Sequence, residues 1–506
     1  MNNIKNLSVE EIFNSALKNH QENKFEEAKD LYDQILKINP NYAQAHNNLG
    51  VIFQNSKEYQ KAIKCYEKAI EIIPNYSNAH NNLGIIFKEN GDTQKAINYY
   101  EKAIEIDSNY LNPYLNLGKL FQEAEEYQKA KNYYEKAIEI QPNNLVSNFN
   151  LGIIFFELNE NQKAKYYYEK AIEIKPNYAE AYNNLGNIYV ELGKNYEAIT
   201  YYQKAIALKA TFADAYANMG RVQKTLGKLE EAINSFKSAK QIDPNLNCEV
   251  SFAATYLKDK DPEKALFLLE NFLKKFPHDS RANAYKTISL RGLAKFDQIE
   301  KLIDFPNLIK KVDAQILTKD KMLEFNKELR NVLIKDPRRK VEKDNDGWAI
   351  RGGTVIRDLF NTTNPSIAKF NIYLRKAIDY YIDSLPDNNT HPFLKIKTKK
   401  YNITSSWVNF LEPGDFQANH IHNNGWMSGV YYLDEPKVEL NKEHAGWIEF
   451  NRAGYNLPHF AGEKGIELIK PKANMFIFFP SYIWHGTIPY REKYSRISIS
   501  FDIRIT

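Results

Sequence analysis

Hydrophobic residues recur along the first half of the chain with the spacing of amphipathic helices, and the whole pattern returns every 34 residues. The dipeptide Leu-Gly marks this register at 49–50, 83–84, 117–118, 151–152 and 185–186, and Met219–Gly220 continues it. Aromatic residues keep the same register at Tyr66, Tyr100, Tyr134, Tyr168, Tyr202 and Phe236. Small residues at fixed places let paired helices approach closely, and prolines such as Pro74 and Pro142 end several units. The pattern therefore predicts a solenoid of paired helices.

This pattern closely resembles that of tetratricopeptide repeats, and the resemblance covers residues 8 to 279. An eighth unit, residues 247–280, lacks the Leu-Gly pair, and a ninth, residues 281–305, is weaker still. The resemblance implies a right-handed α-solenoid with an extended concave surface. We expect about eight repeats and a cap over residues 8–300.

One polar position is asparagine in seven successive units, at Asn14, Asn48, Asn82, Asn116, Asn150, Asn184 and Asn218. An asparagine at one place in each first helix forms a ladder, and its amide can both donate to and accept from a peptide backbone. The ladder resembles those that hold extended polypeptide in O-GlcNAc transferase. We therefore predict that a protein or peptide binds in the concave face of the solenoid. The alternative is that asparagine only suits this helix position, or that the units duplicated recently.

The 34-residue register ends near residue 300, and the character of the sequence changes. Residues 301–344 are lysine-rich with helical spacing, which predicts a helical connector. Residues 365–385 place apolar side chains on one face of a helix, at Ile367, Phe370, Leu374, Ile378 and Ile382. From residue 393 onward, short runs rich in aromatic and β-branched residues predict a β-sandwich or barrel. The predicted fold class is therefore multidomain α + β.

Composition and charge narrow the classes of function. The net charge of +5 is small for 506 residues and comes with no stripe of basic and aromatic residues, so we expect no nucleic-acid partner. The sequence contains no run of 18 apolar residues and no signal-like N-terminus, so we expect no membrane partner. Two distant cysteines, Cys65 and Cys248, exclude a disulfide framework and fit a reducing compartment. We therefore predict a cytoplasmic protein.

Candidate metal chemistry is concentrated in the strand-rich part. The segment QANHIHNNGW holds His420 and His422, which project from the same face of an extended strand and can aim at one point. Histidine is the commonest neutral nitrogen ligand for iron, zinc, copper or nickel. His485, after the strand ANMFIFFPS, is the best candidate for a third ligand. Arg496 lies on the polar face of the last strand with Ser498, Ser500 and Asp502. Each of these residues alone is more often structural, but together they indicate metal binding.

Three segments, SSWVNFLEPGDFQANHIHNNGWMSGVYYL, FIFFPSYIWHGTIPY and SRISISFDI, resemble the iron(II)- and 2-oxoglutarate-dependent oxygenases. The resemblance covers residues 345–506 and is closest to a bacterial branch often fused to tetratricopeptide repeats. It implies a double-stranded β-helix, or jelly roll, with flanking helices. It also implies that His420 and His485 bind iron(II), and that Arg496, assisted by Ser498, pairs with the far carboxylate of 2-oxoglutarate. We expect iron(II) and 2-oxoglutarate as cofactors, oxygen as co-substrate, and ascorbate as a further candidate.

One departure from that superfamily concerns His422, because most members have Asp or Glu at this position. A third histidine keeps three facial ligands and removes a negative charge. The His-x-His form is typical of the branch that the chain resembles, so His422 is included among the predicted ligands. Asp415, Asp434 and Glu449 are carboxylates that could substitute, but none has the right spacing.

A cupin is the alternative family for this segment. Gly414 precedes His420 by the gap of the first cupin motif, but the glutamate of that motif is missing. Arg496 and Ser498 favour the oxygenase, because a cupin would not require that pair. Under the alternative, the domain would bind a metal on a non-catalytic repeat scaffold.

Four further residues are predicted to line the pocket, Trp407, Asn409, Gln417 and Tyr432. His444 and His459 are expected in loops, near the substrate but not as ligands. The predicted function is a dioxygenase that hydroxylates a protein or peptide side chain presented by the solenoid. The same chemistry on a small molecule or a glycan is an alternative, in which the solenoid serves assembly or targeting.

Overall fold

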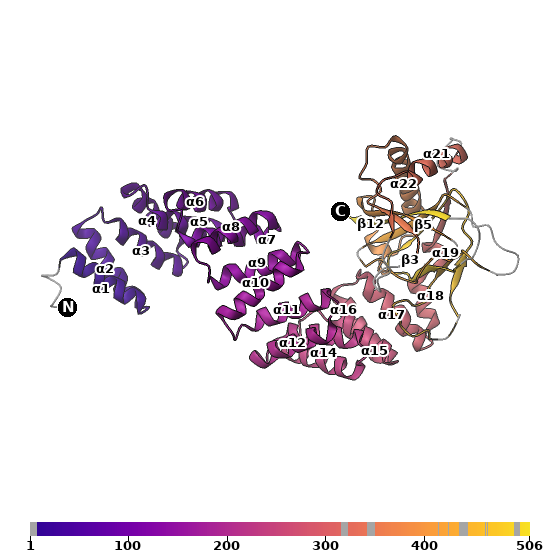
Figure 1. Cartoon of the computed structure of the whole chain (residues 1–506), viewed down its shortest axis with the longest axis horizontal. Helices are drawn as coiled ribbons and strands as arrows, with labels where there is room; N and C mark the ends of the chain where they lie inside the picture. The colour runs from indigo at the N-terminus through magenta and orange to yellow at the C-terminus, as the bar shows by residue number, and fades with distance from the viewer. Residues whose placement is uncertain are drawn as a thin grey trace. The chain divides into compact units, whose positions relative to one another are not determined.

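The computed structural model describes residues 8–314, 322–341, 350–412, 414–423, 425–434, 444–460, 462, 464–489 and 496–506. The chain divides into two compact units, Met1–Asn218 and Met219–Thr506. The first unit consists of paired helices, and the second combines helices with antiparallel sheets (Figure 1).

The helices of the first unit form pairs that recur with the 34-residue spacing of the sequence pattern. Helix α1 is fixed at its start by Ser8, whose hydroxyl accepts from the backbone N–H of Glu11. The first helix of each pair is α1 (Val9–Gln21), α3 (Ala43–Asn55), α5 (Ser77–Glu89), α7 (Leu111–Glu123), α9 (Leu145–Glu157), α11 (Ala179–Glu191) and α13 (Ala213–Thr225). The second helix is α2 (Phe25–Ile38), α4 (Tyr59–Ile72), α6 (Thr93–Ile106), α8 (Tyr127–Ile140), α10 (Asn161–Ile174), α12 (Asn195–Leu208) and, in the second unit, α14 (Leu229–Ile242). The predicted solenoid of paired helices is confirmed.

The glycine of each Leu-Gly pair has a packing reason. A methyl group built on Gly152 would lie 2.5 Å from the ring of Tyr168 in the second helix of the pair. The same relation joins the other pairs, Gly50 with Tyr66, Gly84 with Tyr100, Gly118 with Tyr134 and Gly186 with Tyr202. All five tyrosine rings are buried. Glycine thus lets the aromatic ring pack directly on the backbone of the first helix, which explains why the two positions recur together.

The last repeats belong to the second unit. They comprise α15 (Glu249–Lys258), α16 (Pro262–Lys275), α17 (Ser280–Gly292) and α18 (Phe296–Ile303), followed by the short α19 (Phe305–Leu308). The indole Nε1 of Trp484 donates to the carbonyl of Ala284 in α17 at 3.0 Å, and its ring stacks on Tyr285. The hydroxyl of Tyr482 donates to the carbonyl of Leu302 in α18 at 2.7 Å. The end of the solenoid and the β region therefore share one core.

The main sheet of the second unit has seven antiparallel strands in the order β1-β10-β7-β12-β5-β4-β2. They are β1 (Lys310–Asp313), β10 (Met475–Pro480), β7 (Met427–Tyr432), β12 (Arg496–Ile505), β5 (Tyr401–Leu411), β4 (Thr354–Arg357) and β2 (Lys340–Val341). A three-stranded sheet, β11-β8-β9, and a two-stranded sheet, β3-β6, contain β11 (His485–Thr487), β8 (Ile448–Phe450), β9 (Glu467–Ile469), β3 (Ile350–Arg351) and β6 (Phe416–Gln417). The predicted class, an α-solenoid followed by an antiparallel β region with flanking helices, is confirmed and is consistent with a jelly roll.

The helix predicted at residues 365–385 is α22 (Pro365–Ser384), which the side chain of Asn364 caps. Its five predicted face residues are all buried, Ile367, Phe370, Leu374, Ile378 and Ile382. The ring of Phe370 lies 5.1 Å from that of Tyr431 in β7 and 6.1 Å from that of Phe476 in β10. Helix α22 therefore covers one face of the seven-stranded sheet.

The segment predicted as a helical connector, residues 301–344, is partly β structure. Helix α21 (Met322–Ile334) follows the helical spacing, but β1 and β2 form the two edges of the seven-stranded sheet. Their sequences, KKVD and KV, carry no strand pattern of their own, and pairing with β10 and β4 recruits them. Residues 315–321 and 342–344 lie outside the described part. The domain limits 8–300, 301–344 and 345–506 stay predictions.

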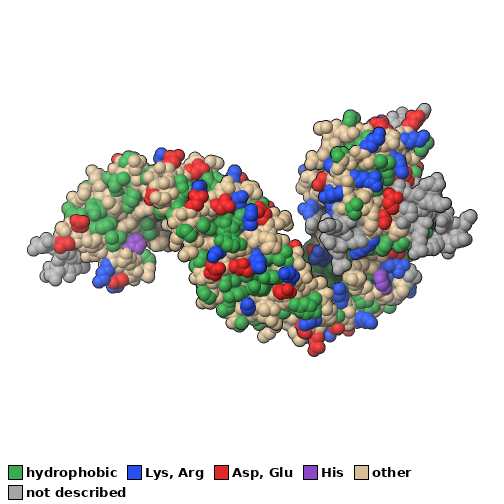
Figure 2. Space-filling view, in the orientation of Figure 1, with side chains coloured by type: hydrophobic (Ala, Val, Ile, Leu, Met, Phe, Trp, Pro, Cys, Tyr) green, Lys and Arg blue, Asp and Glu red, His purple; other side chains and the backbone are tan. Residues whose placement is uncertain are grey.

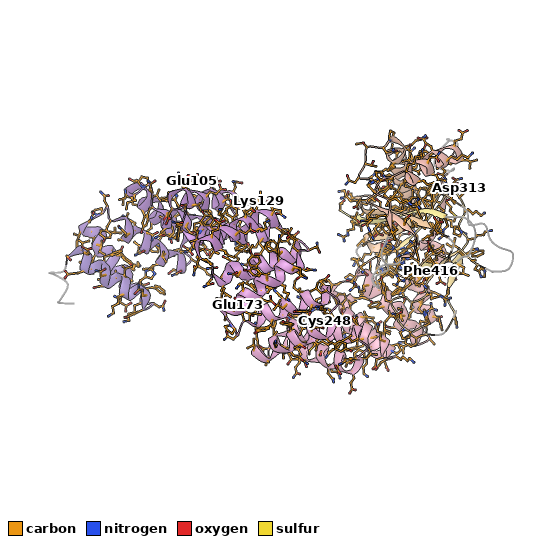
Figure 3. The ribbon with its side chains drawn as sticks, viewed as in Figure 1. Glu105, Lys129, Glu173, Cys248, Asp313 and Phe416 are labelled. Carbon is orange, nitrogen blue, oxygen red and sulfur yellow. The ribbon has the colours of Figure 1, made fainter. Side chains whose placement is uncertain are left out.

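Charged side chains of both signs are interspersed over the visible face of the helices (Figure 2). Several form ion pairs one helical turn apart, such as Lys102 with Glu105 at 2.8 Å and Lys170 with Glu173 at 2.6 Å, and Figure 3 labels both acidic partners. None of the described helices combines the length and the hydrophobicity needed to cross a membrane.

Candidate metal centre

The three predicted histidine ligands converge in the β region. His420 forms an antiparallel bridge with His485, the first residue of β11, through backbone hydrogen bonds of 2.9 and 3.1 Å. His422 follows two residues later, and its backbone N–H donates to the carbonyl of Ser481 at 3.0 Å. One ring nitrogen from each histidine lies within 4.8 Å of the other two. Pairing of two distant segments therefore brings the histidines to one point.

Hydrogen bonds from Nδ1 orient two of these imidazoles. The Nδ1 of His420 donates to the carbonyl of Ala418 at 2.8 Å, and that of His485 donates to the carbonyl of Ile483 at 3.0 Å. Because a carbonyl oxygen only accepts, these contacts put the proton on Nδ1 and leave a lone pair on Nε2. The Nε2 atoms of His422 and His485 lie 3.1 Å apart. The nitrogen lone pairs therefore face a common point that a cation would satisfy.

Burial keeps the imidazole rings of His420 and His485 neutral. His420 and His485 are 8% and 5% exposed. Burial, with the neighbouring His422, lowers the pKa of His420 to about 3, and burial holds the pKa of His485 well below its usual range. Neutral imidazole is the form that binds a metal. Nitrogens at adjacent positions of one metal ion lie roughly 3 Å apart when each bond is about 2.1 Å long. The spacing of the rings therefore fits a metal ion.

The partner of His422 was missed by sequence analysis. The Nδ1 of His422 lies 2.6 Å from Oδ1 of Asp502 in β12, and the same oxygen accepts from the Ser428 hydroxyl at 2.7 Å. A carboxylate behind a histidine ligand fixes its tautomer and raises its basicity. The signal in the sequence was the alternation that puts Asp502 on the polar face of the last strand with Arg496. Which histidine it would meet depends on the fold.

Aromatic rings enclose the three histidines. The Trp407 ring stacks on that of His422 with centroids 5.4 Å apart and an angle of 19°. On the other side, the rings of Phe479 and Phe450 lie 4.4 and 6.4 Å from that of His485. These apolar walls lower the local dielectric and limit the access of water to the ring nitrogens.

The guanidinium of Arg496 lies beside β11. Arg496 is 3% exposed, its Nη1 donates to the carbonyl of Gly446 at 2.6 Å, and its Nη2 donates to the hydroxyl of Thr487 at 3.4 Å. Thr487 stands two residues after His485, and such neighbours on one face of a strand lie roughly 7 Å apart. A buried guanidinium therefore lies beside the strand that begins with His485.

Ser498, predicted to assist Arg496, shares this polar face with two predicted pocket residues, Asn409 and Tyr432. In the sheet register Ser498 lies between Asn409 of β5 and Tyr432 of β7, and all three side chains are buried. The Nδ2 of Asn409 donates to the Ser500 hydroxyl at 3.1 Å, while its Oδ1 has no partner among the described residues. Burial raises the pKa of Tyr432 to about 12, and its ring lies 5.6 Å from the Arg496 guanidinium. A buried amide oxygen without a partner is unusual, and a bound polar group would satisfy it.

Gln417 and the two loop histidines lie outside this polar face. Gln417 is half-buried on β6, in the two-stranded sheet. The ring of His444 packs edge-on against Trp447 at 4.6 Å. His459 lines a cavity of about 300 Å³ that reaches His420. Neither loop histidine joins the cluster.

The three carboxylates considered as substitute ligands are engaged elsewhere. Asp415 accepts from a backbone N–H at 2.8 Å, and Asp434 accepts from the N–H of Ile497 at 3.0 Å. Glu449 accepts from the Asn419 amide at 2.7 Å. Over the residues that the structure covers, the cluster that could hold a metal consists of the three histidines.

The asparagines of the repeats are half-buried, apart from the exposed Asn14. Three of them donate to the preceding repeat, Asn82 to Asn47 at 3.2 Å, Asn116 to Asn81 at 3.0 Å and Asn218 to Asn183 at 3.1 Å. Two others donate to tyrosine hydroxyls, Asn48 to Tyr32 at 3.2 Å and Asn150 to Tyr134 at 3.1 Å. The fixed asparagine therefore has a structural use in these repeats.

Comparison with known families accounts for both parts of the chain. Residues 405–502 match the family model described as "Putative 2OG-Fe(II) oxygenase". Models described as tetratricopeptide or TPR repeats match residues 18–57, 41–109, 112–177, 167–200, 186–227 and 213–246. The chain thus joins tetratricopeptide repeats to a domain of that oxygenase family, and the predicted resemblance is confirmed. No sequence among the curated proteins matches the chain.

Several solved structures are similar to part of the chain. MamA is 29% identical over 32% of this chain and 94% of its own, with a TM-score of 0.31. YrrB, described as a TPR protein with an unusual peptide-binding site, is 26% identical over 36% of this chain and 95% of its own, with a TM-score of 0.30. The C-terminal part of a TPR repeat-containing protein from Cytophaga hutchinsonii is 21% identical over 46% of this chain and 96% of its own, with a TM-score of 0.40.

Proposed function

We propose that the chain is an iron(II)- and 2-oxoglutarate-dependent dioxygenase that hydroxylates a side chain of a protein or peptide. The observation that carries the proposal is the convergence of three buried imidazoles beside a buried guanidinium. His422 and His485 aim their Nε2 atoms at one point, and Arg496 lies against Thr487, two residues along β11. The match of residues 405–502 to an oxygenase family model supports the same chemistry.

His420, His422 and His485 would hold the iron, and Arg496 with the Ser498 hydroxyl would bind the far carboxylate of 2-oxoglutarate. A guanidinium suits this task because it can donate two parallel hydrogen bonds to a carboxylate. When bound, iron(II) with 2-oxoglutarate supplies the oxidising chemistry that joins one oxygen atom of O2 to a C–H bond and forms succinate and carbon dioxide. The protein contributes orientation, a fixed positive charge and a site closed to bulk water.

Asp502 offers an explanation of the unusual ligand set. A carboxylate ligand is usual where this chain has His422, and the Asp502 carboxylate lies directly behind that ring, 2.6 Å from its Nδ1. The hydrogen bond moves electron density onto the imidazole and makes it a stronger donor. A carboxylate bound directly to the metal would supply a negative charge. In this proposal Asp502 supplies part of that charge indirectly, through its hydrogen bond with His422.

The repeats provide the reason to favour a polypeptide substrate. Tetratricopeptide repeats generally mediate contacts between proteins, and the matches to that family span residues 18–246. The asparagine ladder offers amide groups at regular intervals, and several weak contacts along one chain add up to useful affinity. In this proposal the solenoid holds the polypeptide and the metal centre modifies one of its side chains.

Succinate release tests the oxygenase proposal directly. Purified protein with iron(II), 2-oxoglutarate and oxygen should form succinate, measured by proton NMR, with more formed when a peptide library is present. His485→Ala and Arg496→Met should abolish it, whereas His46→Ala, a change in the repeats, should not. If the unaltered protein binds iron but forms no succinate under any of these conditions, the proposal fails. If Arg496→Met forms succinate normally, the assigned role of that guanidinium fails.

A further inference from the structure

Four cationic side chains gather where the repeats meet the β region, within the second unit. Arg221 and Lys224 lie on α13, Lys258 is the last residue of α15, and Arg281 is the second residue of α17. Burial, and then the charges of Lys258, Arg281 and Arg221, lower the pKa of Lys224 to about 8. The charges of Lys258, Arg281 and Arg221 therefore act on Lys224, although 60 residues separate Arg221 from Arg281. We call this group the basic cluster.

A polar cavity adjoins the basic cluster. Its volume is about 340 Å³, and Arg221 and Arg281 line it together with Cys248, Ser251 and Asn423. Cys248, labelled in Figure 3, marks its position among the helices. A volume of this size accommodates one side chain of a peptide with its hydration. The cavity is thus a defined site and not an extended charged surface.

The segment that follows His422 links the cavity to the proposed metal centre. The Nε of Arg281 donates to the side chain of Asn423 at 3.4 Å, and Asn423 directly follows His422. The hydroxyl of Ser280 donates to the carbonyl of Gly425 at 3.0 Å, which ties the start of α17 to the same segment. A group bound in this cavity would therefore lie against the segment that carries one of the proposed metal ligands.

The carboxylates near the cavity have other uses. Asp279 is the only acidic residue that lines it within the described part, and its Oδ1 accepts from the backbone N–H of Ala282 at 2.7 Å as the cap of α17. Glu249 pairs with Lys240 at 2.6 Å. The guanidinium groups of Arg221 and Arg281 line the cavity, and guanidinium groups bind a carboxylate through charge-assisted hydrogen bonds. The arrangement is therefore one that a negatively charged ligand would stabilise.

We propose that this cavity binds the carboxylate of an Asp or Glu side chain in the polypeptide substrate and so sets which neighbouring residue reaches the metal centre. The proposal rests on the proposed oxygenase function for the identity of the ligand as substrate. A nucleic acid fits less well, because its backbone needs a continuous basic stripe and the whole chain carries a net charge of only +5. A single cavity lined by two arginines instead suits one acidic side chain.

Binding of two peptide pools to the full-length protein tests this proposal. Each pool contains fluorescent ten-residue peptides of random sequence drawn from uncharged residues, with Glu fixed at the centre of one pool and Gln in the other. We expect the Glu pool to bind about tenfold more tightly by fluorescence anisotropy at low salt, because charged hydrogen bonds are the stronger ones. The preference should shrink at high salt. Equal affinities for the two pools would overturn the proposal.

Variants assign the preference to the basic cluster. Arg221→Gln and Arg281→Gln, which change the two arginines that line the cavity, should each remove most of the preference for Glu, with folding checked by circular dichroism. Lys237→Met, which removes an exposed lysine of α14 outside the cavity lining, is the matched control and should retain it. A preference that survives both cluster variants would overturn the assignment. So would a single-stranded oligonucleotide that binds more tightly than the Glu pool and depends on the same two residues.

The two proposals fail separately. The pool measurement uses neither iron nor 2-oxoglutarate, so a protein that forms no succinate would refute the oxygenase while the preference for Glu could still be measured. Conversely, succinate release with equal binding of the two pools would refute only the acidic pocket. If both hold, mass spectrometry of the Glu pool should find hydroxylation at a fixed number of residues from the central Glu. A random distribution of hydroxylated positions would contradict the positioning role.

Discussion

The two units of the molecule bury different kinds of side chain. In the repeats the interior consists mainly of small, aliphatic and aromatic residues in recurring contacts, as between Gly152 and Tyr168, with some buried asparagines such as Asn47 and Asn81. The charged residues form exposed ion pairs. In the second unit the interior also holds single polar groups, among them His485, Arg496 and Asn409. A repeated apolar contact contributes stability in small equal shares. A buried polar group costs free energy unless it has a partner, which Asn47 and Asn81 find in the next repeat, whereas Oδ1 of Asn409 has none among the described residues.

This difference indicates which substitutions each unit tolerates. Each contact of the repeats has several equivalents along the solenoid, so the loss of one weakens only its neighbourhood. The histidine cluster has no equivalent in the described residues, and its three members depend on one another. The following changes test that contrast, from the largest expected effect to the smallest.

His485→Ala would break the metal centre itself. We expect metal affinity to fall by more than about 100-fold, because loss of an outer-shell partner alone costs 10–100-fold and this change removes a ligand. Iron content after equilibrium dialysis measures the effect. His46→Ala is the control, since this ring bonds to the carbonyl of Pro40 in the repeats at 2.9 Å. Equal iron in the two variants would contradict the assignment.

Gly152→Ala tests the recurring contact of the repeats. The added methyl group would lie 2.5 Å from the Tyr168 ring, so we expect a local loss of about 2 kcal/mol in the free energy of unfolding. Gly220→Ala is the matched control, because the nearest atom there, on Phe236, is 3.2 Å away. Amide hydrogen exchange in α9 and α10 measures the loss, and iron binding should be unchanged. Equal exchange in the two variants would mean that the contact does not set the helix pairing.

Asp502→Asn probes the group behind His422. The change keeps the shape of the side chain and removes its charge, so we expect iron(II) to bind about 10- to 100-fold more weakly. Anaerobic titration of the metal-free protein measures the affinity. Asp415→Asn is the control, because that carboxylate accepts from a backbone N–H in a loop. If both variants bind iron as the unaltered protein does, the link from Asp502 to the metal is refuted.

Lys224→Met tests how a buried cation affects the stability of the second unit. The pKa of Lys224 is lowered to about 8 from the usual 10.5, so the folded protein binds fewer protons than the unfolded chain between those values. The contribution of Lys224 to the free energy of unfolding therefore rises with pH between about 8 and 10.5. Below pH 8 the charged Lys224 destabilises the folded protein in full. We expect the variant to be about 1 kcal/mol more stable at pH 7 and to lose that pH dependence. Urea unfolding at pH 7 and pH 10 decides it, and a destabilised variant would contradict the cause given.

Glu173→Gln should have the smallest effect. The carboxylate pairs with Lys170 at 2.6 Å, but its side chain is 62% exposed. Exposed pairs of this kind contribute about 0.5 kcal/mol or less, and salt screens them. Thermal unfolding at low and high salt measures the difference. A loss of more than about 1 kcal/mol would show that the surface pairs matter more to the repeats than their exposure indicates.

The helices and histidines that could be predicted are those that local sequence patterns determine. The 34-residue period fixed the helix pairs because each element needs only its own spacing and its neighbour, and α22 followed from its buried face of Ile367, Phe370 and Leu374. The histidines were found because alternation along a strand is also local, and a family resemblance linked His485 to them. The strands β1 and β2 were not found, since their short charged sequences become strands only by pairing with β10 and β4.

The sequence by itself determined the repeats, the order of the two parts and the residue types available for a metal. Only the tertiary structure decided which groups meet. It put Asp502 behind His422, it put the Arg496 guanidinium against Thr487, and it gathered the basic cluster from three helices. The reason is physical. Periodic hydrophobicity acts over a few residues and can be read along the chain, whereas the meeting of distant polar groups depends on strand register and helix docking, which arise only when the whole unit packs.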